Sequence, residues 1–343
     1  MSQNVVQPYR FVPSANPIMY KELDRVTLTG TATTMDTGTF ASKPYLMVLH
    51  HSIPTGGYAN CKYTFNNSSG NAYANRYNEN NGSDATANTQ PNIDMRMGEY
   101  PAPCYAVSTI VNEADTQKQI VSHNVNQNTA GSGTPPADCA LVAKYDQSTS
   151  AITQLESDKT SGGSYASGSE IIVLGADPDD TDTTGSFWEE LAVVDLTTNT
   201  NIMDSGTFTA KQYLWVQLTT TLSSSPEAQI IFNNDSSSIY STRYTVNGGA
   251  STTHTNVSYA SGVTYNSPYN FGNMFILNDQ TTDKMTMVEE VDQGTAGSGT
   301  EPNFREVHNK WADNSNQITR IEVQSSTGGD WASGSKLRVW GAD

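Results

Sequence analysis

Hydrophobic and polar positions alternate along most of this chain with a period of two. The alternating or wholly apolar segments include RVTLTGT, PYLMVLH, CALVAKY and SEIIVLG in the first half, and YLWVQLT, NMFILND, QITRIEV and KLRVWG in the second. They are rich in Val, Ile, Thr, Tyr and Trp, and Gly, Asn, Asp, Ser and Pro separate them, as in β-strands joined by turns. No window combines helical spacing of apolar residues with a cap. The pattern therefore predicts an all-β fold of antiparallel strands.

The second half of the chain repeats the first half in the same order. MDTGTFASKPYLMV, from Met35, corresponds to MDSGTFTAKQYLWV, from Met203, and the closing phrase YASGSEIIVLGAD returns as WASGSKLRVWGAD. The hexapeptide TAGSGT occurs at 129–134 and again at 295–300. The offset is 168 residues from Met35 to Met203 and 166 from Gly175 to Gly341. Solenoid repeats have units of about 20–50 residues, so this repeat predicts two tandem copies of a complete domain.

Each copy carries roughly eight or nine predicted strands, which indicates an antiparallel β-sandwich of the jelly-roll type. We expect an N-terminal arm at 1–20, a first jelly-roll domain at 21–177, an acidic linker at 178–186 and a second jelly-roll domain at 187–343. The closing phrase is expected to form the last strand of each domain. In copy two, Leu337 and Val339 would face the core, and Lys336, Arg338 and Trp340 would face solvent.

The composition limits the partners that the protein can have. Its 35 acidic and 18 basic residues give a net charge of −17, with no basic cluster, so nucleic acid and anionic membranes are not expected ligands. No apolar run approaches the length of a membrane span, and the first residues lack the pattern of a secretory signal. Cys61, Cys104 and Cys139 all lie in copy one, so the duplicated fold does not depend on disulfides. We expect three free thiols and synthesis in a reducing interior.

The sequence contains no catalytic signature. HExxH, C-x-x-C and G-x-S-x-G are all absent, and no pair of carboxylates recurs in both copies as candidates for hydrolysis. TAGSGT lacks the lysine and the helix of a phosphate-binding loop, so it is expected to be a turn or loop between strands. We therefore expect no catalytic residues and no enzymatic activity.

The linker matches the pattern of a calcium-binding loop at some positions but not at all of them. Asp180 and Asp182 would occupy positions 1 and 3 of an EF-hand-like loop, and Gly185 would occupy position 6. Position 12, however, is Leu191, where a calcium loop requires Glu. The other interpretation is a solvated acidic linker. Apart from this Ca²⁺ candidate, we expect no cofactor.

Several loops combine Tyr with Asn in the manner of sugar-binding sites, in which rings stack on sugar faces and amides bind hydroxyls. The other interpretation is that the Tyr residues end strands and the Asn residues close turns. The candidate glycan contacts are Tyr77, Asn80, Asn81, Tyr244, Asn247, Tyr259 and Tyr265.

The order of motifs in copy two resembles a family of virion structural proteins in tailed phages and related marine viruses. The motifs are Phe-Asn-Asn-Asp-Ser from Phe232, the Arg243-Tyr244 pair, Asn-Gly-Gly from Asn247, TAGSGT, Lys310-Trp311 and the closing strand. The resemblance implies tandem lectin-like jelly rolls without known catalytic residues. Copy one departs from it, since Phe65-Asn66-Asn67 is followed by Ser-Ser-Gly and Lys144-Tyr145 replaces Lys-Trp.

The expected function is therefore that of a non-enzymatic virion structural protein, as a coat, capsid-decorating or tail or fibre component. It would be made in the host cytoplasm and incorporated into the virion. It would act by self-association of its jelly rolls into a trimer or larger assembly, together with other virion proteins. The alternative is a carbohydrate-binding module for attachment to a host glycan.

Overall fold

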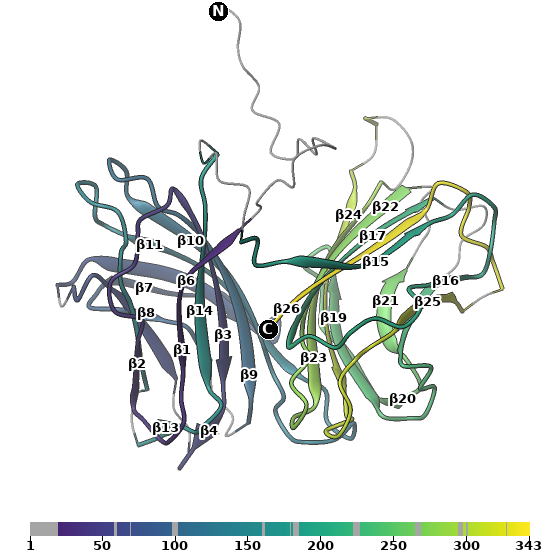
Figure 1. Cartoon of the computed structure of the whole chain (residues 1–343), viewed down its shortest axis with the longest axis horizontal. Helices are drawn as coiled ribbons and strands as arrows, with labels where there is room; N and C mark the ends of the chain where they lie inside the picture. The colour runs from purple at the N-terminus through teal and green to yellow at the C-terminus, as the bar shows by residue number, and fades with distance from the viewer. Residues whose placement is uncertain are drawn as a thin grey trace, which may run out of the picture.

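The computed structural model consists of β-strands and connecting loops (Figure 1). It describes residues 20–57, 60–68, 70–97, 102–159, 162–178, 180, 185–221, 227–264, 269–293, 298–299, 301–326 and 328–343. All regular elements in these ranges are strands, and the described strands pair antiparallel, which confirms the predicted fold class. None of the described residues forms a helix that could span a membrane.

In domain 1 the described strands form two main sheets that face each other. The order of the large sheet is β1 (Lys21–Thr27), β14 (Glu170–Ala176), β3 (Tyr45–Ser52), β9 (Cys104–Val111), β10 (Lys118–Asn126), β11 (Ala137–Tyr145), β6 (Tyr73–Glu79) and β7 (Ala85–Gln90). The order of the small sheet is β2 (Thr34–Asp36), β12 (Leu155–Lys159), β5 (Cys61–Phe65) and β8 (Ile93–Asp94). A further short pair joins β4 (Pro54–Thr55) to β13 (Ser164–Tyr165).

Domain 2 repeats the two main sheets of domain 1 strand for strand in its described part. Its large sheet runs β15 (Glu189–Asp195), β26 (Lys336–Ala342), β17 (Tyr213–Thr221), β22 (Tyr269–Leu277), β23 (Lys284–Asp292), β24 (Asn303–Trp311), β19 (Tyr240–Val246) and β20 (Thr252–Val257). Its small sheet runs β16 (Ile202–Asp204), β25 (Ile321–Ser325), β18 (Glu227–Phe232) and β21 (Ala260–Thr264). In both domains the chain passes repeatedly between the two sheets, as in a jelly roll.

Each domain has a core of its own between its two sheets. The inward residues of the closing strands, Ile171 and Val173 in β14 and Leu337 and Val339 in β26, are fully buried there, as the alternation predicts. Fully burying one such side chain contributes about 1.5–3 kcal/mol. The closing phrase thus recurs because each copy needs a strand that seals its own core.

The glycine of the closing phrase has a steric role. β1 and β15 each contain a register shift, at Leu23 and Leu191, opposite the closing strand. A Cβ added to Gly341 would lie 2.5 Å from Leu191 Cδ1, and one added to Gly175 would lie 2.6 Å from Leu23 Cδ1. Each leucine therefore packs over a position that only glycine leaves open.

The outward face of the closing strands follows the prediction at Lys336, which is exposed, and differs from it at Trp340. In β14, Ile172 and Leu174 are as fully buried as the inward residues, and in β26 Trp340 packs against buried apolar residues instead of facing solvent. The reason is that the outer faces of the two large sheets meet. In Figure 1 the sheets touch at one end and diverge at the other.

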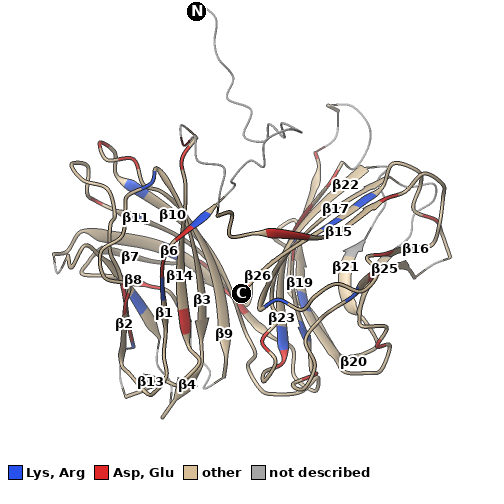
Figure 2. Cartoon of the chain, viewed as in Figure 1, with Lys and Arg blue, Asp and Glu red and all other residues tan. Residues whose placement is uncertain are grey.

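Charged residues are spread thinly over both domains. Figure 2 shows basic and acidic positions distributed along the strands and loops of the described part, without a basic face. The sheet surfaces are therefore formed mainly by uncharged side chains.

Candidate functional site

The contact between the two large sheets is an apolar cluster of its own, separate from the two domain cores. Domain 1 contributes residues from β3, β9, β10 and β14. Domain 2 contributes residues from β17, β22, β23 and β26, and Trp188, which lies just before β15. They are Met47, Leu49, Tyr105, Val107, Val125, Ile172 and Leu174 on one side, and Trp188, Tyr213, Trp215, Leu277, Met285, Met287 and Ala342 on the other.

Aromatic rings fill the domain 2 side of this interface. Trp215 lies 5.8 Å from Trp188, 5.7 Å from Phe275 and 5.2 Å from Trp340, measured between ring centroids. Tyr213 of domain 2 lies 5.9 Å from Tyr105 of domain 1. Such contacts stabilise an interface beyond the area that they bury, by about 0.5–1.5 kcal/mol for each pair.

A buried carboxylate lies at one edge of the cluster. The Tyr213 hydroxyl donates a hydrogen bond to Glu170 Oε2 at 2.7 Å, and Arg25 Nη1 lies 3.2 Å from Glu170 Oε1. Burial, together with the charge of Glu170, raises the pKa of Tyr213 well above its ordinary value, so the phenol stays protonated and remains a donor. The Tyr105 hydroxyl is equally buried, but it has no hydrogen-bond partner among the described residues.

The first TAGSGT segment lies against domain 2. Lys310 Nζ donates to the carbonyl oxygens of Gln127, at 3.0 Å, and Thr129, at 2.6 Å. The Gly131 amide donates to Asp283 Oδ2 at 2.8 Å, and Ser132 Oγ donates to Asn256 Oδ1 at 2.7 Å. Burial lowers the pKa of Lys310 to about 8. The segment was predicted to be a loop between strands; its role as the contact between domains could not be predicted from its sequence. Most of its second copy lies outside the described residues.

A second polar group lies between β11 and domain 2. Arg243 Nε lies 3.4 Å from Asp138 Oδ1 and donates a hydrogen bond to the Pro136 carbonyl at 2.8 Å. His308 Nδ1 lies 4.0 Å from Asp138 Oδ2. Burial raises the pKa of Asp138 to about 6 and lowers the pKa of His308 to about 3. At neutral pH the imidazole is therefore uncharged, and the guanidinium is the counter-ion of the carboxylate.

Two rows of large apolar side chains remain exposed on the outer faces of the large sheets. We call the row on domain 1 the B band, which comprises Tyr45, Val111, Val121 and Val142 with exposures of 41%, 38%, 46% and 49%. We call the row on domain 2 the A band, which comprises Phe271, Val291 and Phe304 with exposures of 40%, 41% and 42%. Each band crosses adjacent strands, whereas scattered exposed residues would not form such a row.

The predicted glycan-contact asparagines close turns. Asn80, Asn81 and Asn247 have φ values of 49°, 56° and 51°, the left-handed region that turns require. Asn80 Oδ1 accepts a hydrogen bond from the Asp138 amide, and Asn247 Oδ1 accepts one from the Phe304 amide. Asn81 Nδ2 donates to the Gly249 carbonyl, which brings the loops YNENNGSD and YTVNGGAS of the two domains together.

Two of the predicted tyrosines stack against side chains of their own domains. Tyr77 lies beneath Arg96, with 4.9 Å between the guanidinium carbon and the ring centroid, and Tyr244 stacks on His254 at 5.9 Å between centroids. Tyr259 is partly buried between β20 and β21, and Tyr265 lies outside the described residues. Glycan binding by the predicted tyrosines and asparagines stays a prediction. The side-chain amides of the asparagines form hydrogen bonds within the loops of the protein.

The predicted calcium ligands are only partly described. Asp180 Oδ2 lies 3.0 Å from Lys43 Nζ and 3.7 Å from Lys21 Nζ, while Asp182 lies outside the described residues. In the part of the chain that the structure describes, no three His, Cys, Asp or Glu residues are placed to hold a metal ion. The three cysteines are free, as expected from the sequence, and the structure buries all three. Burial raises the pKa of Cys104.

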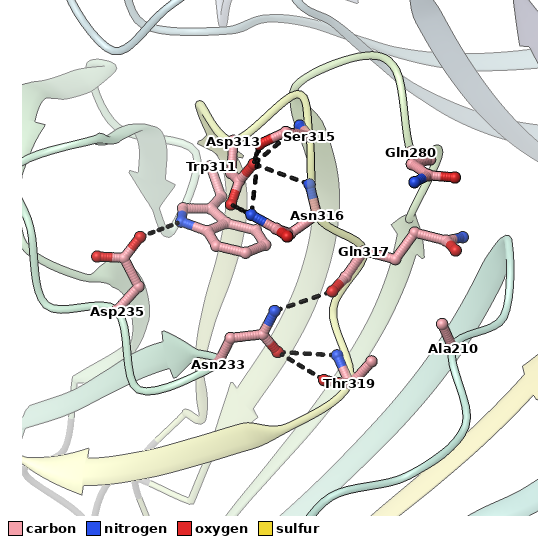
Figure 3. Close-up of a pocket in the computed structure, with 10 residues that line it drawn as sticks. All are labelled: Ala210, Asn233, Asp235, Gln280, Trp311, Asp313, Ser315, Asn316, Gln317 and Thr319. Atoms are coloured by element: carbon pink, nitrogen blue, oxygen red, sulfur yellow. Dashed lines mark hydrogen bonds between the residues drawn. The ribbon is translucent and has the colours of Figure 1, made fainter.

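A cavity of about 550 Å³ opens on domain 2 beside Trp311 (Figure 3). Its lining is polar, but much of it is already hydrogen-bonded within the protein. Asn233 Oδ1 accepts from the amides of Thr319 and Arg320, and Asp313 Oδ1 accepts from the amides of Ser315 and Asn316. Trp311 is 1% exposed and donates its indole N–H toward Asp235, so its ring face is not open to a sugar.

Comparisons with known proteins add little to this geometry. No protein-family model matches the chain, and no curated protein matches it. Among solved structures, domains LG4–5 of the mouse laminin α1 chain align over 98% of this chain and 92% of that one, at 8% identity and a TM-score of 0.20.

Proposed function

We propose that the protein is a non-enzymatic structural component of a virion, as a coat, capsid-decorating or tail or fibre subunit, and that it acts by self-association. The observation that carries this proposal is the pair of exposed apolar bands. Apolar rows on a sheet face are typical of surfaces that another protein covers.

The arrangement of the domains supports the same proposal. Each domain has its own sealed core, so the outer sheet faces are available for contacts instead of being needed for folding. The interface inside the chain is an example of such a contact between two of these faces. The order of motifs in copy two, which resembles virion proteins, supports the setting: assembly into particles with other virion proteins after synthesis in the host cytoplasm.

The test is the native mass of the purified protein, measured by light scattering with and without a chelator. We expect a trimer or larger assembly, well above the 37.1 kDa of one chain. A 37.1 kDa monomer at high concentration would contradict self-association. Dissociation caused by the chelator would show that Ca²⁺ contributes. Mass spectrometry of purified particles tests the assignment to a virion, and absence of the protein from particles contradicts it.

The second candidate is a carbohydrate-binding module for host attachment, which the cavity beside Trp311 favours. Its polar residues Asp235, Gln280 and Asp313 have Ser68, Ala114 and Gln147 as their counterparts in copy one. At these places copy two carries two carboxylates and an amide, where copy one has a hydroxyl, a methyl group and an amide. A glycan array tests this candidate: binding by the wild type that is lost in Gln280→Ala supports it, and no binding to any glycan contradicts it.

A further inference from the structure

We infer that the two exposed bands bind each other between copies of this chain, so that the A band of one copy packs on the B band of the next. The inference rests on the proposed function and deepens it, because it names the partner as a second copy and the contact as head-to-tail. The reason is that residues buried in the interface between the domains have exposed counterparts at the equivalent positions of the other domain.

The strand registers of the two domains establish these counterparts. In domain 1, Tyr105 pairs with Val125, and at the same place in domain 2 Phe271 pairs with Val291. Tyr45 pairs with Val111 at the other end of domain 1, as Tyr213 pairs with Leu277 in domain 2. By the same registers Val121 corresponds to Met287, Val142 to His308, and Asp138 to Phe304.

The interface inside the chain joins unlike bands. From domain 1 it buries Tyr105 and Val125, whose counterparts in domain 2 are Phe271 and Val291 of the exposed A band. From domain 2 it buries Tyr213, Leu277 and Met287, which are the counterparts of the exposed B band of domain 1. Each type of band therefore occurs twice in one chain. One copy is buried in the interface between the domains, and the other copy is exposed. A contact between unlike bands is heterologous and repeats from subunit to subunit. Inside the chain the equivalent positions His123 and Glu289 also meet, at 3.0 Å.

The exposed halves are complementary to each other. Tyr105 and Tyr213 are in contact inside the chain, and their exposed counterparts Phe271 and Tyr45 are again two aromatic residues. At a second place a polar pair inside the chain corresponds to an apolar pair on the exposed bands. Asp138 lies beside His308 inside the chain, and their counterparts are Phe304 and Val142, an apolar pair.

A lysine that binds a backbone carbonyl across the interface also has a counterpart on the exposed B band. Lys310 donates to the Gln127 carbonyl across the interface inside the chain. Its counterpart on domain 1, Lys144, is exposed at the edge of the B band. In the head-to-tail contact, Lys144 of one copy would face the carbonyl of Gln293, the counterpart of Gln127, in the next copy.

This contact leads either to a closed ring or to an open filament. Figure 1 shows that the two large sheets diverge from their common contact. Whether the repeated rotation closes determines which assembly forms. In both cases every chain offers one A band and one B band to its neighbours.

Two substitutions that each block one band test the inference. Val142→Asp blocks the B band and leaves the A band intact, and Phe304→Asp does the reverse. Both side chains are exposed, at 49% and 42%, so the thermal unfolding of each variant should match that of the wild type. Asn201→Asp is the matched control, because it adds the same charge on an exposed loop beside the small sheet.

We expect each blocked variant alone to have the 37.1 kDa mass of one chain, and an equimolar mixture of the two to form a dimer of twice that mass. The mixture dimerises because one variant supplies the A band and the other supplies the B band. Asn201→Asp should assemble like the wild type. If the wild type assembles but the mixture stays monomeric, or the blocked variants still assemble, the inference is overturned and self-association by another surface remains. A wild type that stays monomeric overturns both the inference and the proposed self-association.

Discussion

Two tyrosines in the interface between the domains provide a matched test of what stabilises it. Tyr105 and Tyr213 are both fully buried and lie 5.9 Å apart, so removing either hydroxyl leaves the rings in place. The two hydroxyls differ in their partners. That of Tyr213 donates to Glu170, whereas that of Tyr105 has no partner among the described residues.

The expected magnitudes follow from this difference. Tyr213→Phe removes a hydrogen bond to a carboxylate, which typically contributes about 1.5–3 kcal/mol. Glu170 keeps Arg25 and Thr27 as partners, so we expect a loss near the lower end, about 1.5–2 kcal/mol. Tyr105→Phe removes a buried donor that gains nothing in the folded protein, so we expect a change between zero and a gain of about 1 kcal/mol.

The assay is unfolding in urea, followed by circular dichroism for both domains and by tryptophan fluorescence for domain 2 and the interface. Three of the five tryptophans, Trp188, Trp215 and Trp340, lie at the interface and will report its opening. Equal destabilisation by the two substitutions would refute the reasoning. It would mean that the Glu170 contact contributes no more than packing around the ring.

Three further predictions concern the interface and the cores. The folded pKa of His308, about 3, lies below its ordinary 6.5, so the unfolded chain binds that proton first and the contribution of His308 to stability falls as the pH drops from 6.5 toward 3, by up to about 1.4 kcal/mol per pH unit. Asp138, whose pKa is raised to about 6, contributes in the opposite direction below pH 6. The quantity to measure is therefore the stability of the wild type minus that of His308→Gln, which should fall over this range. Gly341→Ala should cost about 1–3 kcal/mol in chemical unfolding, since its Cβ meets Leu191, whereas Gly133→Ala, with open space around it, should be neutral. Asn278→Asp places a carboxylate against the two carbonyls that its amide now binds and should lower stability by about 3 kcal/mol or more, while Asn201→Asp does not.

The fold could be predicted because its information is local. Alternation placed Leu337 and Val339 in the core correctly, and the repeat of motifs in register predicted the duplication. The error about the outward face had a local signal as well. SEIIVLG in copy one is apolar on both faces, which is typical of a strand covered on both sides, whereas KLRVWG in copy two alternates.

The interface could not be predicted, because its two halves are distant in sequence. Gly131 and Asp283 are 152 residues apart, and neither segment alone indicates a contact. The roles of the glycan-candidate asparagines had a clearer signal. Asn80-Asn81 and Asn247-Gly248 lie between strand-like segments, where such pairs favour tight turns with positive φ.

Covalent linkage changes the affinity that the interface between the domains must have. Two domains on one short connection meet at an effective concentration of the order of millimolar, so about 4 kcal/mol of intrinsic affinity keeps them together at any dilution. Separate chains at micromolar concentration would need about 8 kcal/mol. The linked interface can therefore retain groups that are costly to bury, such as Asp138 and Lys310, whose pKa values record that cost.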